Sequence, residues 1–501
     1  MQRDADLTFG DIHGDFATLI SRITQCQTQT LYAEQENDAA SDLRFLCTPP
    51  NWILADSEPP TVIRLADRGE NIGVSDYVAI SYCWGSHSGA GVSAHRFSIS
   101  TANGERRPRC PNMVLYRAIK FAQGRNIPFI WIDQECIEQD DTSDKERYLQ
   151  VMHKIYSRSR FTAGLLSFPS ITLRQIMSIL YLEEHSLLIE DHTNSPRDRL
   201  PEDCDSTTIL EIQRLLRAIS RDRWFTRTWI LQEKIAAMKQ LILLLPGPPT
   251  QLPGWTHSEI EFMPGKAMGT AYYLKSQFSL IDPQTASSID LLLGQLHSMF
   301  GFDVLVESIV EPLQSTVYLD MSESSAFKAM ESCDNAIVPD RIAIYANIFH
   351  FPKRLDSRLL STHGFTSFST AFLALLLHNG RIPMVIASHT YDSPSKAAHT
   401  GPILPISATL AELMDGIMRL EDVEDTEDRR EVDAQLIRYG VITTPFFNPE
   451  SRFVCYGGDF AWRIDFIKTY FRESDAPRWD PIRFNLLVEQ LNLGRILGIE
   501  E

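Results

Sequence analysis

The 501-residue chain has few cysteines, and no spacing pairs them. Its eight cysteines lie far apart and never occur as Cys-x-x-Cys. A disulfide framework needs densely placed cysteines, and a structural zinc site needs closely spaced pairs. The sequence therefore predicts reduced thiols in an intracellular, cytoplasmic protein.

Long apolar runs and an excess of positive charge are also missing. The most apolar run, at 371–377, is far shorter than the roughly 20 residues that a membrane helix requires. No charged and apolar leader opens the chain, so we expect no signal peptide. Lysine and arginine total 47 against 65 acidic residues, a formal net charge of -18, which argues against broad nucleic-acid binding. We expect neither a membrane partner nor a DNA partner.

One short metal-binding motif lacks the companions that it needs. The stretch FGDIHGDF at 9–16 resembles the opening of a metallophosphoesterase site, in which an aspartate and a histidine bind one of two metals. A site with two metals takes about six ligands, and no GNHE motif follows in the chain. The sequence therefore favours a polar turn at 10–15, followed by a short helix.

Strands and helices alternate between residues 77 and 245. Apolar runs rich in β-branched and aromatic residues predict strands at 77–85, 127–133, 161–167 and 241–245. Apolar residues at helical spacing predict helices at 112–123, 145–159, 208–219 and 228–239. This alternation describes an α/β fold with a parallel sheet flanked by helices. The working residues of such sheets lie in loops beyond the carboxyl ends of the strands.

The composition changes on either side of this region. Residues 1–45 are polar and mixed, which predicts an N-terminal extension before an α/β domain at 46–247. A Pro/Gly-rich linker, PGPPTQLPG, then leads into a mostly helical C-terminal region at 248–501. The acidic run at 421–433 is predicted to be a solvated face.

An acidic loop follows the second predicted strand. Its carboxylates are Asp133, Glu135, Glu138, Asp140, Asp141, Asp144 and Glu146. Such a group could bind Mg²⁺, orient a cationic substrate or serve as a general base. The alternative is structural, with Asp144 as a helix N-cap, Glu146 interacting with the helix dipole and Asp133 fixing the turn.

Three blocks of this region together resemble the HET domain, the heterokaryon-incompatibility domain of filamentous fungi. They are YVAISYCWG at 77–85, IWIDQECIEQDDTSDKERYLQVMHKIYSRS at 130–159 and DRWFTRTWILQE at 222–233. A further stretch at 340–356 is similar to one found downstream in many fungal proteins of this type. The resemblance implies a role in non-self recognition and cell death.

The HET domain is in turn similar to the TIR domain, a flavodoxin-like α/β fold. TIR-type enzymes cleave NAD with a helix glutamate in a W-x-x-x-E-like setting, which Trp229 and Glu233 match. The resemblance implies NAD as a substrate, Glu233 as the catalytic carboxylate and Trp229 as a substrate-binding residue. Trp84, at the carboxyl end of the strand predicted at 77–85, is a further candidate substrate-binding residue. A carboxylate beside a tryptophan can stabilise an oxocarbenium-like centre or take a ribose proton. The structural alternative is a surface Glu233 on a helix whose Trp229 packs inward.

The acidic loop resembles a second family. DDTSD at 140–144 is similar to the DDxxE motif of fungal arginine-containing cyclodipeptide synthases, transferases of secondary metabolism, with Asp in place of the final Glu. This resemblance implies aminoacyl-tRNA as a partner and catalysis by Asp140, Asp141, Asp144 and Glu146. Carboxylates such as Asp133 and Glu135 would then bind the arginine guanidinium. A third hypothesis is a non-enzymatic signalling module that self-associates, and the sequence leaves all three open.

Overall fold

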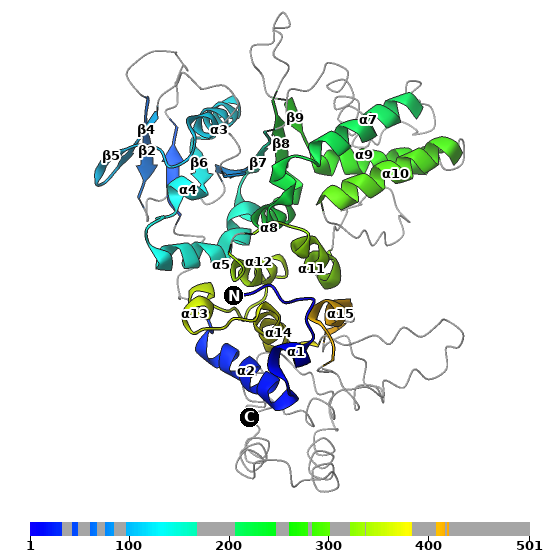
Figure 1. Ribbon diagram of the computed structural model, residues 1–501. Coiled ribbons are helices and arrows are strands. Elements are labelled where there is room, and N and C mark those ends of the chain that lie inside the picture. The colour runs from blue at the N-terminus through cyan, green and yellow to red at the C-terminus, as the bar shows by residue number, and fades with distance from the viewer. Residues whose placement is uncertain are drawn as a thin grey trace, which may run out of the picture. The chain divides into compact units, whose positions relative to one another are not determined.

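The computed structural model describes residues 1–32, 43–48, 61–67, 76–84, 97–167, 206–246, 260–278, 283–300, 321–335, 337–382, 407–415 and 418–419. The chain divides into two compact units, Glu34–Ala336 and a second one made of Met1–Ala33 with Ile337–Glu501 (Figure 1). The expected linear division at residues 45 and 247 stays a prediction. The acidic run at 421–433 lies outside the described residues.

A nine-stranded sheet forms the centre of the unit Glu34–Ala336, in the order β5-β4-β2-β1-β6-β3-β7-β8-β9. The strands are β1 Phe45–Cys47, β2 Thr61–Ala66, β3 Tyr77–Tyr82, β4 Phe97–Thr101, β5 Gly104–Arg106, β6 Phe129–Ile132, β7 Phe161–Leu165, β8 Leu241–Leu245 and β9 Ile260–Phe262. The neighbours β6, β3, β7 and β8 all pair in parallel. Flavodoxin-like sheets arrange their first four strands in this same order.

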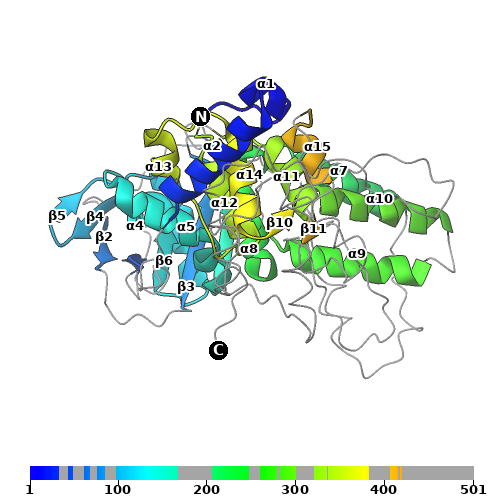
Figure 2. The ribbon, with the colours of Figure 1, turned by 90° about the horizontal axis from the view of Figure 1, so that it is seen from below.

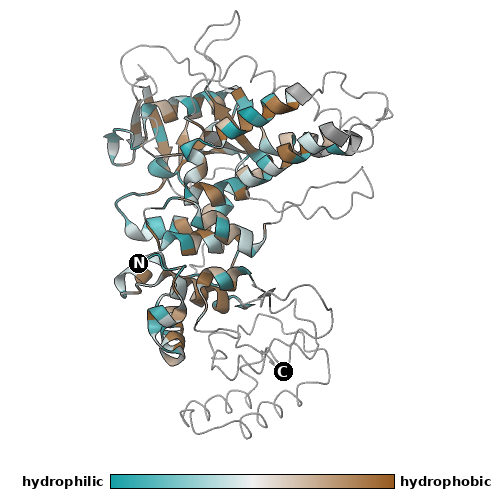
Figure 3. Cartoon of the chain, turned by 45° about the vertical axis from the view of Figure 1, so that its right-hand side comes forward, coloured by the Kyte–Doolittle hydropathy of each residue, from teal (hydrophilic) through white to brown (hydrophobic). Residues whose placement is uncertain are grey.

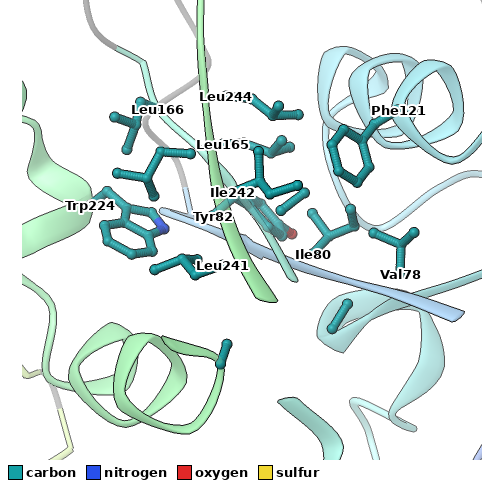
Figure 4. Close-up of a cluster of buried hydrophobic side chains, with 14 of the residues drawn as sticks. Val78, Ile80, Tyr82, Phe121, Leu165, Leu166, Trp224, Leu241, Ile242 and Leu244 are labelled. Atoms are coloured by element: carbon teal, nitrogen blue, oxygen red, sulfur yellow. The ribbon is translucent and has the colours of Figure 1, made fainter. Parts of the chain in front are cut away.

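The α/β class predicted from the sequence is confirmed, and so are its four strands and four helices between residues 77 and 245. The helices are α3 Asn112–Gly124, α5 Thr142–Arg158, α7 Ser206–Ile219 and α8 Thr228–Ala236. Continuous burial of β3 and β8 explains why these strands read as unbroken apolar runs, because helices cover both faces of the central sheet. Figure 4 shows Val78 and Ile80 close to Phe121 of α3, with Trp224 on the other side of the strands.

The sheet is mixed, whereas the sequence predicted a parallel one. The short strand β1 pairs antiparallel with both β2 and β6, and β5 and β9 add antiparallel edges. Strands of three residues carry too few positions to show a period of two, so hydrophobic patterning does not reveal them. Hydrophobic residues gather in the strands, while both kinds of residue alternate along the helices around them (Figure 3).

Further helices complete this unit on the side of β8. They are α9 Pro264–Phe278, α10 Pro283–Phe300 and α11 Glu323–Glu331. Apolar residues of α9 and α10 join the same core as the sheet, among them Leu274, Leu292 and Phe300. The core therefore continues past the end of the predicted α/β domain.

The second unit is helical and combines the two ends of the chain. Its helices are α1 Phe9–His13, α2 Phe16–Gln29, α12 Asp340–Ile348, α13 Ser357–Thr362, α14 Phe368–His378 and α15 Leu410–Asp415, beside the two-residue strands β10 Arg381–Ile382 and β11 Met418–Arg419. Figures 1 and 2 both show α2 beside α14, and Gln27 Nε2 donates to the Ala374 carbonyl at 2.9 Å. The apolar run at 371–377 is the buried middle of α14. Among the described helices, none is long and apolar enough to cross a membrane.

The motif at 9–16 contains helix α1 and the start of α2, so the turn predicted at 10–15 is wrong except at Gly14 and Asp15, whereas the helix predicted after it is confirmed. Thr8 and Asp11 form a capping box, and Gly14 adopts a φ of 78° that allows α2 to begin two residues later. His13 Nε2 lies 2.6 Å from the Thr370 hydroxyl. Hydrogen bonds within the fold therefore occupy the residues that would bind a metal.

Candidate functional site at the carboxyl ends of the central strands

The candidate site lies at the carboxyl ends of the central strands, next to β3, where successive strands are added on opposite sides of the sheet. From β3 the chain passes to β6 on one side, then returns to β7 on the other side. In doubly wound sheets, ligands bind at the carboxyl ends of the strands at such a switch point. Trp84 lies just after β3, and Asp133 directly follows β6 as the first residue of α4 Asp133–Cys136.

Glu233 approaches this point from α8, which packs against β3 and α5. Only 6% of Glu233 is exposed, so the expectation of a surface glutamate is wrong. The hydroxyls of Ser81 and Tyr156 lie near its carboxyl group, and Asp133 lies close enough to affect its charge. The Tyr156 hydroxyl donates to the Ile80 carbonyl at 3.3 Å. The second carboxyl oxygen of Glu233, Oε2, has no hydrogen-bond partner in the part of the chain that the structure describes. Trp229 is partly buried and packs against the core, as the structural alternative expected.

The environment of Glu233 opposes its ionisation. Burial raises the pKa of its carboxyl group to about 8, and the negative charge of Asp133 acts in the same direction. The nearby hydroxyls of Ser81 and Tyr156, and the positive charge of Arg227, lower the pKa and partly offset this rise. Glu233 is therefore mostly protonated at neutral pH and can donate a proton as well as accept one.

Asp133 is the second carboxyl group of the site. Its Oδ2 accepts a hydrogen bond of 3.0 Å from Trp84 Nε1, and its Oδ1 accepts one of 2.7 Å from the Gln134 backbone. Burial raises the pKa of Asp133 to about 6, while these hydrogen bonds and Arg227 lower it. Trp84 stays 40% exposed, so an aromatic face borders the site. Two carboxyl groups with different pKa values form an acid and base pair near neutral pH.

A buried hydrogen-bond chain fixes the position of Ser81. Trp224 Nε1 donates to Ser81 Oγ at 2.9 Å, and both residues are buried. Asp222 holds the Trp224 backbone N–H at 2.8 Å and that of Ser167 at 2.8 Å. Asp222 and Trp224 thus connect Ser167, which follows β7, to Ser81 of β3.

Four residues of this site are missed by the sequence analysis, namely Ser81, Tyr156, Trp224 and Arg227. Ser81 is a small polar residue in an otherwise apolar strand, which is a usable signal. Tyr156 belongs to the predicted apolar stripe of its helix, so nothing in the sequence separates it from a packing residue. Their convergence follows from the order of the strands.

The acidic loop pairs with arginines instead of opening toward a ligand. Glu135 is fully buried, accepts from Arg106 Nη1 at 2.6 Å and from the Cys110 backbone at 2.8 Å. Glu138 binds Arg109 and lies 3.5 Å from Arg44 Nη1. Asp144 lies 3.5 Å from Arg44 Nη2 and accepts the Glu138 backbone N–H at 3.0 Å.

The remaining acidic residues have structural roles or face solvent. Asp141, and not Asp144 as expected, is the N-cap of α5, because it accepts the N–H groups of Ser143 and Asp144. Glu146 accepts from Gln150 Nε2 at 2.7 Å. The Asp140 side chain is 93% exposed and lies 3.6 Å from Arg109 Nη2.

The acidic loop and Glu233 therefore lie in different environments. The structure brings Glu233, Asp133 and Trp84 together, and it places Glu135, Glu138, Asp140 and Asp144 beside arginines. Within the described ranges, no three His, Cys, Asp or Glu side chains are grouped so that they could hold a metal ion. Carboxylates already paired with guanidinium groups do not fit Mg²⁺, and they do not favour the cyclodipeptide synthase hypothesis.

The fold and the site define a doubly wound α/β unit with a carboxyl pair at its switch point, the buried Glu233 and the half-buried Asp133. Residues 77–233 match the family model described as Heterokaryon incompatibility protein (HET), so this part of the chain is a HET domain. A curated relative, "Heterokaryon incompatibility protein 6, OR allele" of Neurospora crassa, is 26% identical over 186 residues.

The matched region has definite limits. It covers 31% of this chain and 27% of the Neurospora crassa protein, so about a quarter of that relative's length is compared. No solved structure matches the chain. Ser81, Asp133, Tyr156 and Glu233 all fall within the HET domain.

Proposed function

We propose that the protein acts in fungal non-self recognition through heterokaryon incompatibility, and that its HET domain does so by cleaving NAD. The HET domain and the named relative support the first part of this proposal. The observation that carries the second part is Glu233, a buried carboxyl group with one oxygen unpartnered among the described residues, close to Asp133 at the switch point. A group of this kind has a cost in stability, which a role in chemistry explains.

The charge of the site suits the nicotinamide end of NAD. The ring nitrogen of the bound nicotinamide carries a positive charge, and cleavage moves positive charge onto the ribose. Burial raises the pKa of both carboxyl groups, and the charge of Asp133 raises that of Glu233 further, so both become easier to ionise when a cation lies between them. The exposed face of Trp84 can stack on a planar ring beside Asp133.

The reaction is a hydrolysis at the C1′ carbon of the nicotinamide ribose. The bond from C1′ to the ring nitrogen breaks, and its electron pair returns to the nicotinamide, which leaves as a neutral molecule. The ionised carboxylate of Glu233 stabilises the oxocarbenium-like centre. A water molecule then adds to C1′ and gives its proton to a carboxylate of the site. The products are ADP-ribose, nicotinamide and one proton.

The proposal sets a structural requirement. Because only 6% of Glu233 is exposed, the elements that cover it must part when NAD binds. Trp84, which ends the described segment after β3, lies at the exposed side of the site. Motions of this kind commonly complete an active site on substrate binding.

Expression in yeast tests the proposal in a cell. Wild type is expected to lower cellular NAD, raise nicotinamide and ADP-ribose, and stop growth, whereas Glu233→Gln leaves NAD and growth normal. Glu211→Gln is a matched control on α7, where Glu211 forms a helical pair with Arg214 at 2.7 Å. Growth arrest with unchanged NAD, equal in wild type and Glu233→Gln, would instead support a non-enzymatic signalling module.

A further inference from the structure

A second cavity lies on the opposite side of α8 from β3. It measures about 610 Å³, is open to solvent on one side and is lined by residues of α7, α8, α10 and α11, all within the unit Glu34–Ala336. Leu216, Phe225, Leu231 and Met299 form apolar walls, and Lys234 of α8 is also part of its lining. Glu233 and Lys234, adjacent in sequence, thus face two different environments.

Lys234 places a cation in this cavity, where the other group that affects its charge is the Cys333 thiol, which favours the charged form. The side chain is buried, and its Nζ donates to the Met299 carbonyl at 2.7 Å and lies 5.7 Å from the centre of the Phe225 ring. Among the described residues, no carboxylate lies within ion-pair distance of Lys234. Asp290, an acid in the lining, pairs with Lys275 Nζ at 2.6 Å.

An ammonium group in this position has unused binding capacity. Lysine carries three N–H donors, and one of them is satisfied by the Met299 carbonyl. Burial lowers the pKa of Lys234 to about 8, so the group is still mostly charged at neutral pH. Removing one partner of a buried ion pair is strongly destabilising, and a ligand anion would supply the partner that is missing here.

The rim of the cavity adds polar and apolar groups. Arg217 lies at the exposed side of the lining, and Leu291 leaves 62% of its surface in solvent. The cavity has a buried cation, Lys234, a second cation at its rim, Arg217, and apolar walls between them. These features match a ligand with an anionic group and an apolar body. The volume accommodates a molecule of a few fused or linked rings, or a medium-length acyl chain.

We propose that this cavity binds a small amphipathic anion, whose anionic group pairs with Lys234 and whose apolar part packs against Phe225 and Leu231. The proposal concerns binding alone and does not rest on NAD cleavage at Glu233. It assigns a ligand site to the helices α10 and α11, which lie beyond the HET domain. The lining also provides a way to close the cavity, because a Cβ added at Gly294 would meet nothing within 4 Å.

Titration of the full chain with 8-anilinonaphthalene-1-sulfonate tests the proposal, since this probe carries an anionic sulfonate on an apolar ring system. We expect saturable binding of one equivalent by fluorescence and calorimetry. Lys234→Met should weaken it by at least about ten-fold, because the charge pair is lost. Gly294→Leu, which fills the space, should abolish it, and Lys266→Met, at an exposed lysine of α9, should leave it unchanged.

A neutral probe separates the anion from the apolar body. N-phenyl-1-naphthylamine has similar rings without the sulfonate, and we expect it to bind at least about ten-fold more weakly to the wild type. Equal affinities of the two probes, no saturable binding to the wild type, or unchanged binding in both Lys234→Met and Gly294→Leu would overturn the proposal. Circular dichroism and tryptophan fluorescence verify that each variant is folded, and Gly294→Leu gives an independent result if Lys234→Met does not fold.

Discussion

Replacing Glu233 with glutamine measures how strongly the fold opposes the charge of this carboxyl group. Burial raises its pKa from 4.5 to about 8. Between these values the folded state keeps a proton that the unfolded state releases, so the wild type loses stability as the pH rises from 4.5 to 8. Each pH unit in this window is worth about 1.4 kcal/mol.

Glutamine has nearly the same shape and does not titrate, so the variant does not share this loss. The free energy of unfolding of Glu233→Gln, relative to the wild type, should therefore rise by up to about 4 kcal/mol between pH 5 and pH 8. Loss of the carboxyl group's own contacts lowers the variant's stability by about 1–3 kcal/mol at every pH. The slope of the difference, and not its sign at one pH, is the prediction.

Urea unfolding at several pH values provides the assay. Trp131 and Trp224 are fully buried in the same unit as Glu233, so their fluorescence reports its unfolding. Glu138→Gln is the control, because the hydrogen bond from Arg109 lowers the pKa of Glu138 and its ionisation is complete above pH 6. The difference for this control should stay flat from pH 6 to 8. An equally flat difference for Glu233→Gln would refute the reasoning.

Three further substitutions test the packing and the charges around the site. Lys234→Met should raise the free energy of unfolding by up to about 3 kcal/mol at pH 7, because burial lowers the pKa of Lys234 from 10.5 to about 8. Lys234 is neutral in both states above pH 10.5, so urea titrations should show no gain there. Gly164→Ala should cost about 1–3 kcal/mol in thermal unfolding, because its Cβ would lie 2.6 Å from Leu243 Cδ2 and 3.1 Å from Trp224 Cζ2. Gly294→Ala should instead gain up to about 1 kcal/mol, since it removes a glycine from α10 without a clash.

Hydrophobic periodicity was sufficient to predict the positions of the strands and helices that contribute many residues to the core. It placed β3, β6, β7 and β8 and the helices between them, because long buried elements repeat their pattern often enough to be read. It missed β1, β5 and β9, which are three residues long, and it also missed the longer β2 and β4. The mixed character of the sheet is thus a property of tertiary pairing.

The candidate site was predictable in part. Trp84, Asp133 and Glu233 follow from strand ends and a family resemblance, but the burial of Glu233 depends on Ser81 and Tyr156, which lie far from it in the chain. The same lack of tertiary information made the acidic loop look reactive. Its neutralising partners are arginines from other segments, and no local pattern places them beside it.

The release of nicotinamide from NAD by the purified protein tests the central claim most directly. The account predicts nicotinamide and ADP-ribose in equal amounts, with a rate at least about a hundred-fold lower in Glu233→Gln and unchanged in Glu211→Gln. Intact NAD after incubation with the wild type, or the same rate in Glu233→Gln, would contradict it.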